Sequence, residues 1–563
     1  MAENKQTPFT AADAIVRELV RAGVEVAFGI VSIHNLPIYE AIRKEGSIRL
    51  VCARGESGAV NMADGYARAT GKLGVAITST GTGAGNAAGA LAEAWSAGAP
   101  VLHLTSEVAS PYRGTGRGYI HECKDQLSMM DGASKKAIHL WRPGQAAAVI
   151  RLAIQEACAI PSGPVTVQIP IDFQSAIVPE SQIEQVQVNL QKAGVIRLNI
   201  PDNILRKMAA SKRPVIWAGG GVIAADASSE LTELAEWLEA PVITSQSGRG
   251  AIPEDHPLCI GHFASFERTK QLLGKSDFLI SAGVRFRSHE TDTWKMEIPA
   301  DHLSIDADLH AVNRNFPVNC SLIGNAKVIL RSLLEALKKR ERAQNPEYRK
   351  EILEIRTCLR RQVRDTLGPY EKILDAMRTI LPRNAILVRD VTIQANVWGS
   401  RLFEIYEPRT SIHAAGGGIG QGLPMAIGAQ IGRKDRVVVL MAGDGGFMVN
   451  VGELATAAQE NLPLIIVLFD DGGYGVLRNI QDAVYGQRIA VDLLSPDFVE
   501  LGHSMGFASV TVGSPEQFAS ALAHAVQARK PSMIVVDMNA VGPMAKPFGG
   551  PPGAKDVFRP HKQ

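Results

Sequence analysis

The pattern of hydrophobic and polar positions divides the chain into short apolar runs and longer amphipathic segments. The apolar runs are rich in β-branched residues and include GVAIT, APVLHLT, GPVTVQIP, PVIWAGG, PVITS, DFLISAG, HLSIDAD, RVVVLMAGDGG and LPLIIVLFD. Runs of this kind are typical of strands that are buried on both faces. Because they alternate with helical segments, the pattern predicts an α/β protein with doubly wound parallel sheets covered by helices on both sides.

Two polar stretches interrupt this pattern, at residues 183–200 and 337–362. A chain of 563 residues exceeds the size at which a single core stops growing, so about three or four domains are expected. We therefore predict three domains, over residues 1–185, 195–340 and 365–550.

The first and third of these domains resemble each other in sequence. Each contains a strand, a Gly-rich turn, a helix of small residues, a proline and another strand. The offset between them is nearly constant, since Gly81 and Gly443 are 362 positions apart and Pro100 and Pro463 are 363 apart. We infer two copies of one module on either side of a different one, which suggests a ligand shared between the two copies.

Composition and charge favour a small-molecule ligand. The chain has 59 Lys and Arg against 57 Asp and Glu, without long blocks of one sign, which argues against a nucleic-acid or membrane surface. The N-terminal residues lack the pattern of a secretion signal, and no apolar stretch approaches the length of a membrane span, so we expect a cytoplasmic protein. Six scattered cysteines without a CxxC pair are typical of reduced, structural thiols and do not predict a zinc site.

Candidate chemistry is clearest in the third domain. The strand RVVVLM is followed by Gly443, Asp444, Gly445 and Gly446 and then by the expected helix FMVNVGELATAAQ, so backbone N–H groups at a helix start form a phosphate cradle. A carboxylate in such a cradle requires a cation. Asp471 ends the next strand 27 residues after Asp444, and adjacent parallel strands bring their carboxyl ends together. This spacing predicts magnesium bridging a diphosphate.

At these residues the chain resembles the thiamin-diphosphate enzymes of the acetolactate synthase, pyruvate oxidase, 2-oxoacid decarboxylase and benzaldehyde lyase group. Their signature is Gly-Asp-Gly followed, some 27 residues after its aspartate, by the second of two asparagines. The resemblance implies that Asp444, Asp471 and the carbonyl of Gly473 bind magnesium and that the amides of Gly445 and Gly446 hold the diphosphate. This chain departs from the family in having the pair Asp470–Asp471 where asparagines are usual.

The resemblance covers essentially the whole chain and implies further cofactor contacts. In RGESGAVNMADGYARATGK, Glu56 matches the family's glutamate, which hydrogen-bonds the pyrimidine N1′ and promotes removal of the C2 proton through the imino tautomer. In HAAGGGIGQGLPMAIGA, Gly417 matches the carbonyl that accepts a hydrogen bond from the 4′-amino group, and Ile419 matches the aliphatic wedge between the cofactor rings.

The three domains correspond, by the same resemblance, to a pyrimidine-binding, a middle Rossmann-like and a diphosphate-binding domain. The middle domain binds FAD in some members, an ADP group in others and nothing in many, and the G-x-G-x-x-A pattern at Gly219–Ala224 leaves that choice open. Because different subunits supply the two halves of the cofactor site in the family, we expect a homodimer or homotetramer with the active site at the subunit interface.

Substrate class depends on a few positions near the cofactor's reactive carbon. The resemblance places His34 and His121 there, and it places Val476 and Leu477 in an apolar substrate pocket. We predict a lyase or carboligase that decarboxylates 2-oxoacids and forms acyloins, as acetolactate synthases do. The alternatives are benzaldehyde lyase-like cleavage of 2-hydroxyketones or diketones, and an inactive regulatory homologue that still binds the cofactor.

Overall fold

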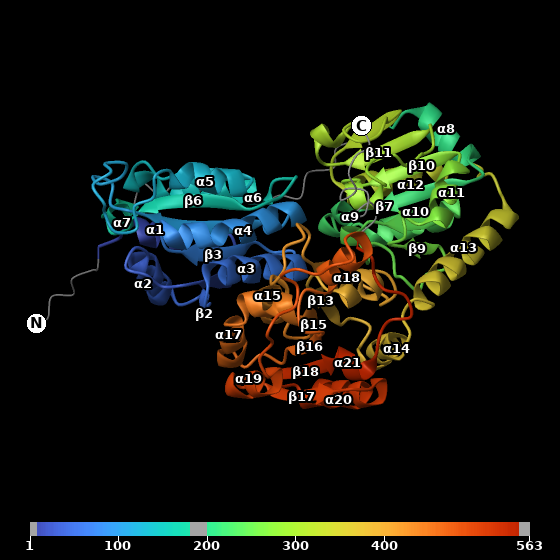
Figure 1. The fold of residues 1–563 in the computed structure, drawn as a ribbon. Coiled ribbons are helices and arrows are strands. Elements are labelled where there is room, and N and C mark those ends of the chain that lie inside the picture. The colour runs from blue at the N-terminus through green and yellow to red at the C-terminus, as the bar shows by residue number, and fades with distance from the viewer. Residues whose placement is uncertain (1–7, 181–199, 551–563) are drawn as a thin grey trace, which may run out of the picture. The chain divides into compact units, whose positions relative to one another are not determined.

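A computed structural model describes residues 8–180 and 200–550 of the chain. It contains three six-stranded sheets, each with helices on its faces (Figure 1). Neighbouring strands pair in parallel throughout the three sheets. The predicted α/β fold with three doubly wound parallel sheets is confirmed.

The first sheet has the strand order β2-β1-β3-β4-β6-β5. Its central strands are buried along their whole length, as expected where helices cover both faces. Its elements are α1 (Ala11–Arg21), β1 (Val26–Gly29), α2 (Leu36–Glu45), β2 (Arg49–Cys52), α3 (Glu56–Thr70), β3 (Gly74–Thr78), α4 (Thr82–Ala97), β4 (Val101–Glu107), α5 (Gln126–Ala133), β5 (Lys136–His139), α6 (Ala146–Cys158), β6 (Val165–Pro170) and α7 (Ile171–Gln174).

The second sheet has a different order, β12-β11-β10-β7-β8-β9, and belongs to the middle of the chain. Its elements are α8 (Asp202–Ala210), β7 (Pro214–Ala218), α9 (Gly220–Ala224), α10 (Ser228–Leu238), β8 (Val242–Thr244), β9 (Cys259–Gly261), α11 (Glu267–Gly274), β10 (Phe278–Ala282), β11 (His302–Asp306), β12 (Cys320–Ile323) and α12 (Ala326–Leu337). The long helix α13 (Pro346–Arg364) and α14 (Tyr370–Ile380) follow it.

The third sheet repeats the order of the first, as β14-β13-β15-β16-β18-β17. This shared topology agrees with the duplication inferred from the constant sequence offset. Its elements are β13 (Ile386–Arg389), β14 (Ser411–His413), α15 (Gly422–Gly432), β15 (Val438–Gly443), α16 (Asp444–Phe447), α17 (Glu453–Gln459), β16 (Ile465–Asp470), α18 (Gly475–Val484), α19 (Phe498–Ser504), β17 (Ala508–Val512), α20 (Pro515–Ala528), β18 (Ser532–Asp537) and α21 (Met538–Val541).

One element differs from the sequence expectation. The helix expected over FMVNVGELATAAQ is not continuous, because α16 ends at Phe447, a 3-10 turn spans Met448–Asn450, and α17 begins at Glu453. The side-chain amide of Asn450 donates to the carbonyl of Gly420 over 2.7 Å, and the carboxylate of Glu453 accepts backbone N–H groups from another segment. The expectation of one unbroken helix was wrong, and the side chains of the interrupted stretch make specific contacts with other segments.

The described chain divides into two compact units. Unit one contains the first sheet together with residues 414–435 and 448–464, and unit two contains the second and third sheets. The domain boundary predicted at residues 183–200 falls almost entirely outside the described residues, and the one at 337–362 falls on the end of α12 and on α13. The predicted domain limits therefore stay predictions.

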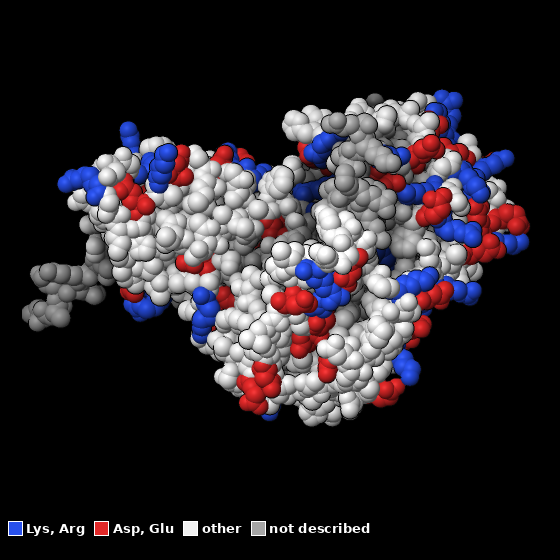
Figure 2. Space-filling view, in the orientation of Figure 1, with Lys and Arg blue, Asp and Glu red and all other residues white. Residues whose placement is uncertain are grey.

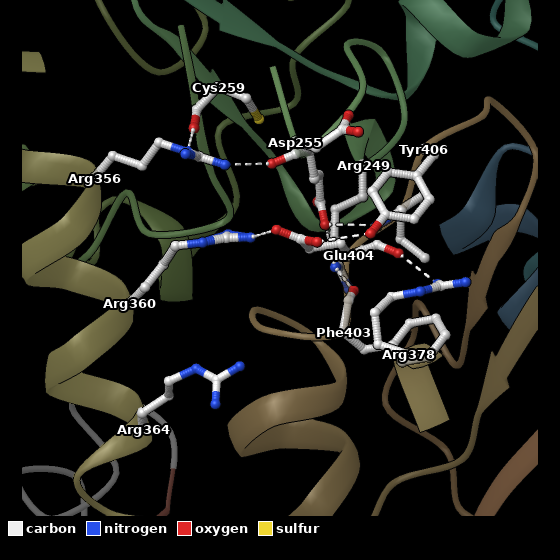
Figure 3. A network of polar contacts seen from close by, with 12 residues as sticks. Arg249, Asp255, Cys259, Arg356, Arg360, Arg364, Arg378, Phe403, Glu404 and Tyr406 are labelled. Carbon is white, nitrogen blue, oxygen red and sulfur yellow. Dashed lines mark hydrogen bonds and ion pairs between the residues drawn. The ribbon is translucent and has the colours of Figure 1, made fainter. Parts of the chain in front are cut away.

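Inside unit two, arginines link the second sheet to the connection between β13 and β14 of the third (Figure 3). Arg249 is fully buried and forms an ion pair of 2.6 Å with Glu254, while its guanidinium also donates to the carbonyls of Gly399 and Phe403. Arg356 and Arg360 of α13 contact the same region. Each buried charge has several partners. Removal of one charged side chain would leave its partners uncompensated, so the network fixes this part of unit two.

The charged surface and the longest helices limit the kinds of partner. On the face in Figure 2, basic and acidic side chains are mixed over the surface, in keeping with the near balance of the two signs in the sequence. Among the residues that the structure describes, no helix combines the length and apolar character that crossing a membrane requires.

Candidate active site

The predicted residues of the first module lie at one edge of the first sheet. His34 follows β1, Glu56 follows β2, Gly81 follows β3, and the segment with His121 follows β4. These four strands are neighbours and run parallel, so the segments after them meet at the same carboxyl edge. This is where open α/β sheets bind ligands.

Glu56 is the first residue of α3 and is partly exposed. The side-chain amide of Asn86, on α4, donates to its Oε2 over 3.1 Å. A Cβ placed on Gly83 would lie 3.0 Å from Oε1, so the start of α4 passes close to the carboxyl group. The carboxyl is thus held in place by one donor and keeps an oxygen that can hydrogen-bond a ring nitrogen. Its role in a proton relay stays a prediction.

The two predicted histidines are brought together, although they are far apart in the sequence. Their ring centroids lie 4.9 Å apart with an edge-to-face angle of 77°. His34 is 3 % exposed, and its Nδ1 has no hydrogen-bond partner among the described residues. Burial, and next the nearby His121, lower the pKa of His34 from its ordinary value. A neutral imidazole with a free ring nitrogen is able to accept a proton.

Gln126, which the sequence analysis did not select, fixes the segment that carries His121. Its side-chain oxygen accepts hydrogen bonds from the backbone N–H of Gly81 over 2.5 Å and from the hydroxyl of Thr80 over 2.9 Å, and its amide donates to the carbonyl of Ser106. A Cβ at Gly81 would overlap the carbonyl of His121, so only glycine allows this approach. His121 itself has a φ of +64°.

The Gly-rich loop before α15 also lies in unit one. Gly417 has a φ of +85°, a left-handed conformation that favours glycine, and no heavy atom would lie within 4 Å of a Cβ placed on it. Ile419 is 38 % exposed. An open backbone face beside an exposed aliphatic side chain fits the two predicted contacts to a bent cofactor.

The acidic residues of the third sheet converge in unit two. Asp444 follows β15 directly, and Gly443 pairs in register with Phe469 of β16, two positions before Asp471. Asp444 is 2 % exposed, and its Oδ2 accepts from the hydroxyl of Ser495 over 3.2 Å. Burial raises the pKa of Asp444, and burial together with the Asp444 charge raises the pKa of Asp471 to about 6. A carboxylate whose pKa is raised by burial and by a neighbouring carboxylate is suited to sharing a cation with it.

A carbonyl completes this arrangement. A Cβ placed on Gly445 would lie 3.1 Å from the carbonyl oxygen of Gly473 and 2.8 Å from the ring of Tyr474. The Gly473 carbonyl oxygen therefore lies close to the turn that contains Asp444, and its role as a metal ligand stays a prediction. Gly473 forms an isolated bridge with Asp492, and Tyr474 donates its backbone N–H to the carbonyl of Val491, so a second strand of chain fixes the turn.

Arg478 is a further residue that the sequence analysis missed. Its guanidinium donates to the backbone carbonyls of Asp471 over 3.0 Å and of Gly472 over 3.1 Å. It also pairs with the side chain of Asp492 at 2.9 Å and lies 3.8 Å from the carboxylate of Asp471. The arginine thus offsets part of the extra negative charge that Asp471 brings to this turn. An arginine one helical turn after a Gly-rich acidic loop was the signal in the sequence.

The predicted pocket residues of α18 differ in exposure. Val476 is partly buried and packs on the core of unit two, whereas Leu477 is 50 % exposed. Their assignment to a substrate pocket stays a prediction.

The residues present fit a magnesium-bridged diphosphate. The described residues contain no group of three or more His, Cys, Asp or Glu side chains that could hold a metal ion. The predicted site is of another kind, since it has two carboxylates and one backbone carbonyl, and oxygen ligands of this type are those that magnesium prefers beside a phosphate. The ring of Tyr474 fills the Cβ position of Gly445, so the structure shows close packing at this glycine, and the contact of the Gly445 and Gly446 amides with a diphosphate stays a prediction.

The glycines of the middle domain have a packing role. The backbone N–H of Gly219 donates to the carbonyl of Ala282 over 2.9 Å, and that of Gly221 donates to the carbonyl of Gly283 over 3.1 Å. A Cβ on Gly221 would lie 2.7 Å from the Cα of Gly283. These two N–H groups therefore have partners within the protein, and whether the middle domain binds FAD, an ADP group or nothing stays a prediction.

Comparisons with known proteins cover nearly the whole chain. Family models described as the N-terminal TPP binding domain, the central domain and the C-terminal TPP binding domain of thiamine pyrophosphate enzymes match residues 9–129, 202–333 and 393–536.

Curated proteins align with it over most of its length. A probable acetolactate synthase large subunit of Methanocaldococcus jannaschii is 32% identical over 96% of this chain and 94% of its own length. A probable 2-ketoarginine decarboxylase of Pseudomonas aeruginosa is 32% identical over 89% of each chain, and the acetolactate synthase isozyme 3 large subunit of Escherichia coli is 29% identical over 94% of this chain and 95% of its own. With three matching domain models, the shared fold and a relative that is 32% identical over 96% of this chain, the chain is a member of the thiamine pyrophosphate-dependent enzyme family.

Proposed function

We propose that this chain uses thiamin diphosphate and magnesium to decarboxylate a 2-oxoacid and to join the acyl group to a second carbonyl compound, in the manner of an acetolactate synthase. The observation that carries the proposal is the identity of 32% to a probable acetolactate synthase along 96% of the chain. The decarboxylase relative at the same identity also acts on a 2-oxoacid, which supports this substrate class.

The residues of the site have complementary tasks in this proposal. The bound cofactor would supply a thiazolium carbon that stabilises negative charge next to a carbonyl. Asp444, Asp471 and the Gly473 carbonyl would hold the metal, and the amides of Gly445 and Gly446 would hold the diphosphate. Glu56 would carry the proton that moves to and from the pyrimidine ring, and Asn86 would orient its carboxyl group.

Cleavage of 2-hydroxyketones or diketones is the second candidate, and the paired histidines favour it. Such cleavage requires a base for the hydroxyl proton, whereas loss of carbon dioxide does not. His34 is buried, has a lowered pKa and lies 4.9 Å, between ring centroids, from His121. The other alternative, an inactive regulatory homologue, has less support because Glu56 and the acidic turn are both in place.

We propose further that the protein works as a homodimer or homotetramer. Val31, Ile33, Leu36 and Ile120 are each at least half exposed and lie in the segments that carry the two histidines. Covering such a surface with another copy of the chain would remove apolar area from water. Cytoplasmic location stays a prediction, as does binding of FAD, which the absorbance of the purified protein near 450 nm would test.

A substrate panel tests the function. Apoprotein is combined with thiamin diphosphate and magnesium and assayed with 2-oxoacids, acyloins and diketones, with carbon dioxide and products measured separately. We expect 2-oxoacid turnover that requires both additions and that a chelator abolishes. Turnover of acyloins or diketones without carbon dioxide release would instead establish the lyase alternative. Cofactor binding without turnover of any compound would contradict both.

A further inference from the structure

Two buried glutamates in unit one have no task in the proposed chemistry. Glu93 on α4 and Glu453 on α17 are each 2 % exposed. A carboxylate buried to this extent is costly unless it is strongly hydrogen-bonded. Burial raises the pKa of both groups, and the hydrogen bonds that each receives act in the opposite direction.

Glu453 accepts hydrogen bonds from the backbone of the residues immediately before Glu56. Its Oε1 accepts the backbone N–H of Arg54 over 3.1 Å and that of Gly55 over 3.0 Å. The hydroxyl of Thr456 donates to its Oε2 over 2.7 Å. Gly55 is the N-cap residue of α3, and Glu56 is its first residue. The carboxylate of Glu453 therefore fixes the start of α3 and, with it, the position of Glu56.

Glu93 likewise accepts hydrogen bonds from the backbone of the residues immediately before Gly417. Its two oxygens accept the backbone N–H groups of Ala415 and Gly416, the latter over 2.8 Å. A Cβ on Gly416 would lie 2.8 Å from Oε2, so the carboxylate is in close contact with the loop. The position of the Gly417 carbonyl therefore depends on Glu93.

The two glutamate contacts lie in corresponding parts of the duplicated module. The glutamates are 360 positions apart, and the paired N–H groups at Arg54–Gly55 and Ala415–Gly416 are 361 positions apart. Each module thus supplies a carboxylate to the loop of the other. Two contacts of the same kind, each between a buried glutamate and two successive backbone N–H groups, indicate a shared task rather than two unrelated packing solutions.

We propose that Glu93 and Glu453 are positioning residues that set the Gly417 carbonyl and the Glu56 carboxyl in their places before the cofactor binds. The inference rests on the proposed roles of Glu56 and Gly417. Two charge-assisted hydrogen bonds to one rigid peptide segment hold it more firmly than neutral bonds would. Neither glutamate touches the reacting atoms, so each acts through the loop that it holds.

The first experiment uses the apoprotein and needs no activity. Hydrogen exchange, measured by mass spectrometry, is compared in wild type, Glu453→Gln, Glu93→Gln and Glu460→Gln. Glu460 is the matched control, because it follows α17 and pairs with Arg49 of the other module without contacting either loop. Glu453→Gln should speed exchange about tenfold or more at residues 54–55 only, and Glu93→Gln at 415–416 only. Exchange that is unchanged, or raised equally in all variants, would overturn the proposal.

The second experiment separates positioning from stability. With cofactor and magnesium, Glu453→Gln should slow hydrogen–deuterium exchange at the cofactor C2 and lower kcat about tenfold or more while KM changes little, and Glu460→Gln should do neither. A loss shared by Glu460→Gln would overturn the assignment. Thr456→Val, which removes one donor to Glu453, should give a smaller effect of the same kind if Glu453→Gln does not fold. Wild-type protein that fails to bind the cofactor would refute the proposed function. The hydrogen exchange of the apoprotein would still test the two glutamate contacts.

Discussion

At the scale of single residues, the most unusual feature is the aspartate pair at the end of β16. Asp470 accepts the backbone N–H of Gly472 over 3.2 Å and so serves the turn itself. Asp444 helps to raise the pKa of Asp471, and Arg478 acts in the opposite direction. The two aspartates therefore have different tasks although they are adjacent.

Substitutions at Asp471 should show this difference. Asp471→Asn keeps an oxygen ligand and removes repulsion from Asp444, so magnesium-dependent cofactor affinity should persist or increase, whereas Asp471→Ala should lower it about tenfold or more. Calorimetric titration of cofactor and magnesium into each apoprotein measures this. Asp470→Asn is the control and should change the affinity least; a larger loss there than in Asp471→Ala would contradict the proposed ligand set.

Glu56 gives the second prediction at this scale. Glu56→Gln keeps a hydrogen bond to the pyrimidine ring but cannot relay a proton, so cofactor affinity should change little and turnover should fall by about 10²- to 10⁴-fold. Hydrogen–deuterium exchange at the cofactor C2, followed by NMR after acid quench, measures the step directly. Asn86→Ala should have a smaller effect of the same sign, because it removes only the orienting donor. Wild-type exchange in Glu56→Gln would refute the relay.

The histidine pair gives a pH dependence. Burial and, second, His121 lower the pKa of His34, so cleavage of an acyloin by neutral His34 should be lost only below the ordinary histidine pKa of about 6.5. His121→Gln removes one cause of the lowering, and the acidic limb of kcat/KM should move to higher pH. His34→Gln should abolish that limb. Profiles of kcat/KM against pH for the three proteins decide this, and an acidic limb that stays in place in His121→Gln would exclude the coupling.

At the scale of elements, the crossing of α3 and α15 depends on two glycines. A Cβ on Gly65 would overlap the carbonyl of Met425, and a Cβ on Gly428 would overlap the carbonyl of Met62. Gly65 and Gly428 are 363 positions apart, and so are Met62 and Met425, so the contact is reciprocal, as the glutamate contacts are. The short sequence Met-Ala-x-Gly, present in both helices, is what allows the backbones to meet.

Alanine at these glycines should therefore destabilise the protein. Gly65→Ala and Gly428→Ala should each lower the free energy of unfolding by about 1–3 kcal/mol, because backbone must move to admit the methyl group. Gly89→Ala is the control, since nothing lies within 4 Å of its Cβ position on α4, and it should be neutral or stabilising. Chemical denaturation measures the three changes. Equal effects at Gly65 and Gly89 would show that helix propensity, not close approach, explains the glycine.

At the scale of the whole molecule, the sequence predicted what periodicity and spacing control. The long buried runs coincide with central strands such as β3, β4 and β16, whereas short edge strands such as β5 and β17 have mixed burial and were not identified. The spacing of Asp444 and Asp471 was enough to bring them to one edge, because parallel strands fix that geometry. The approach of His34 to His121 depends on the path of a long connection that Gln126 fixes, and no local pattern encodes it.

The likeness of α3 and α15 has a consequence for assembly from the unfolded chain. Each helix presents the same Met-Ala-x-Gly surface, so the surface that recognises the unlike helix is also complementary to a copy of itself on another molecule. Intramolecular pairing is independent of concentration, but pairing of α3 with α3 between molecules is not. The yield of native protein on refolding should therefore fall as protein concentration rises. A bulkier, complementary pair of side chains at one crossing point of α3 and α15 would make the two surfaces distinct and restore the yield.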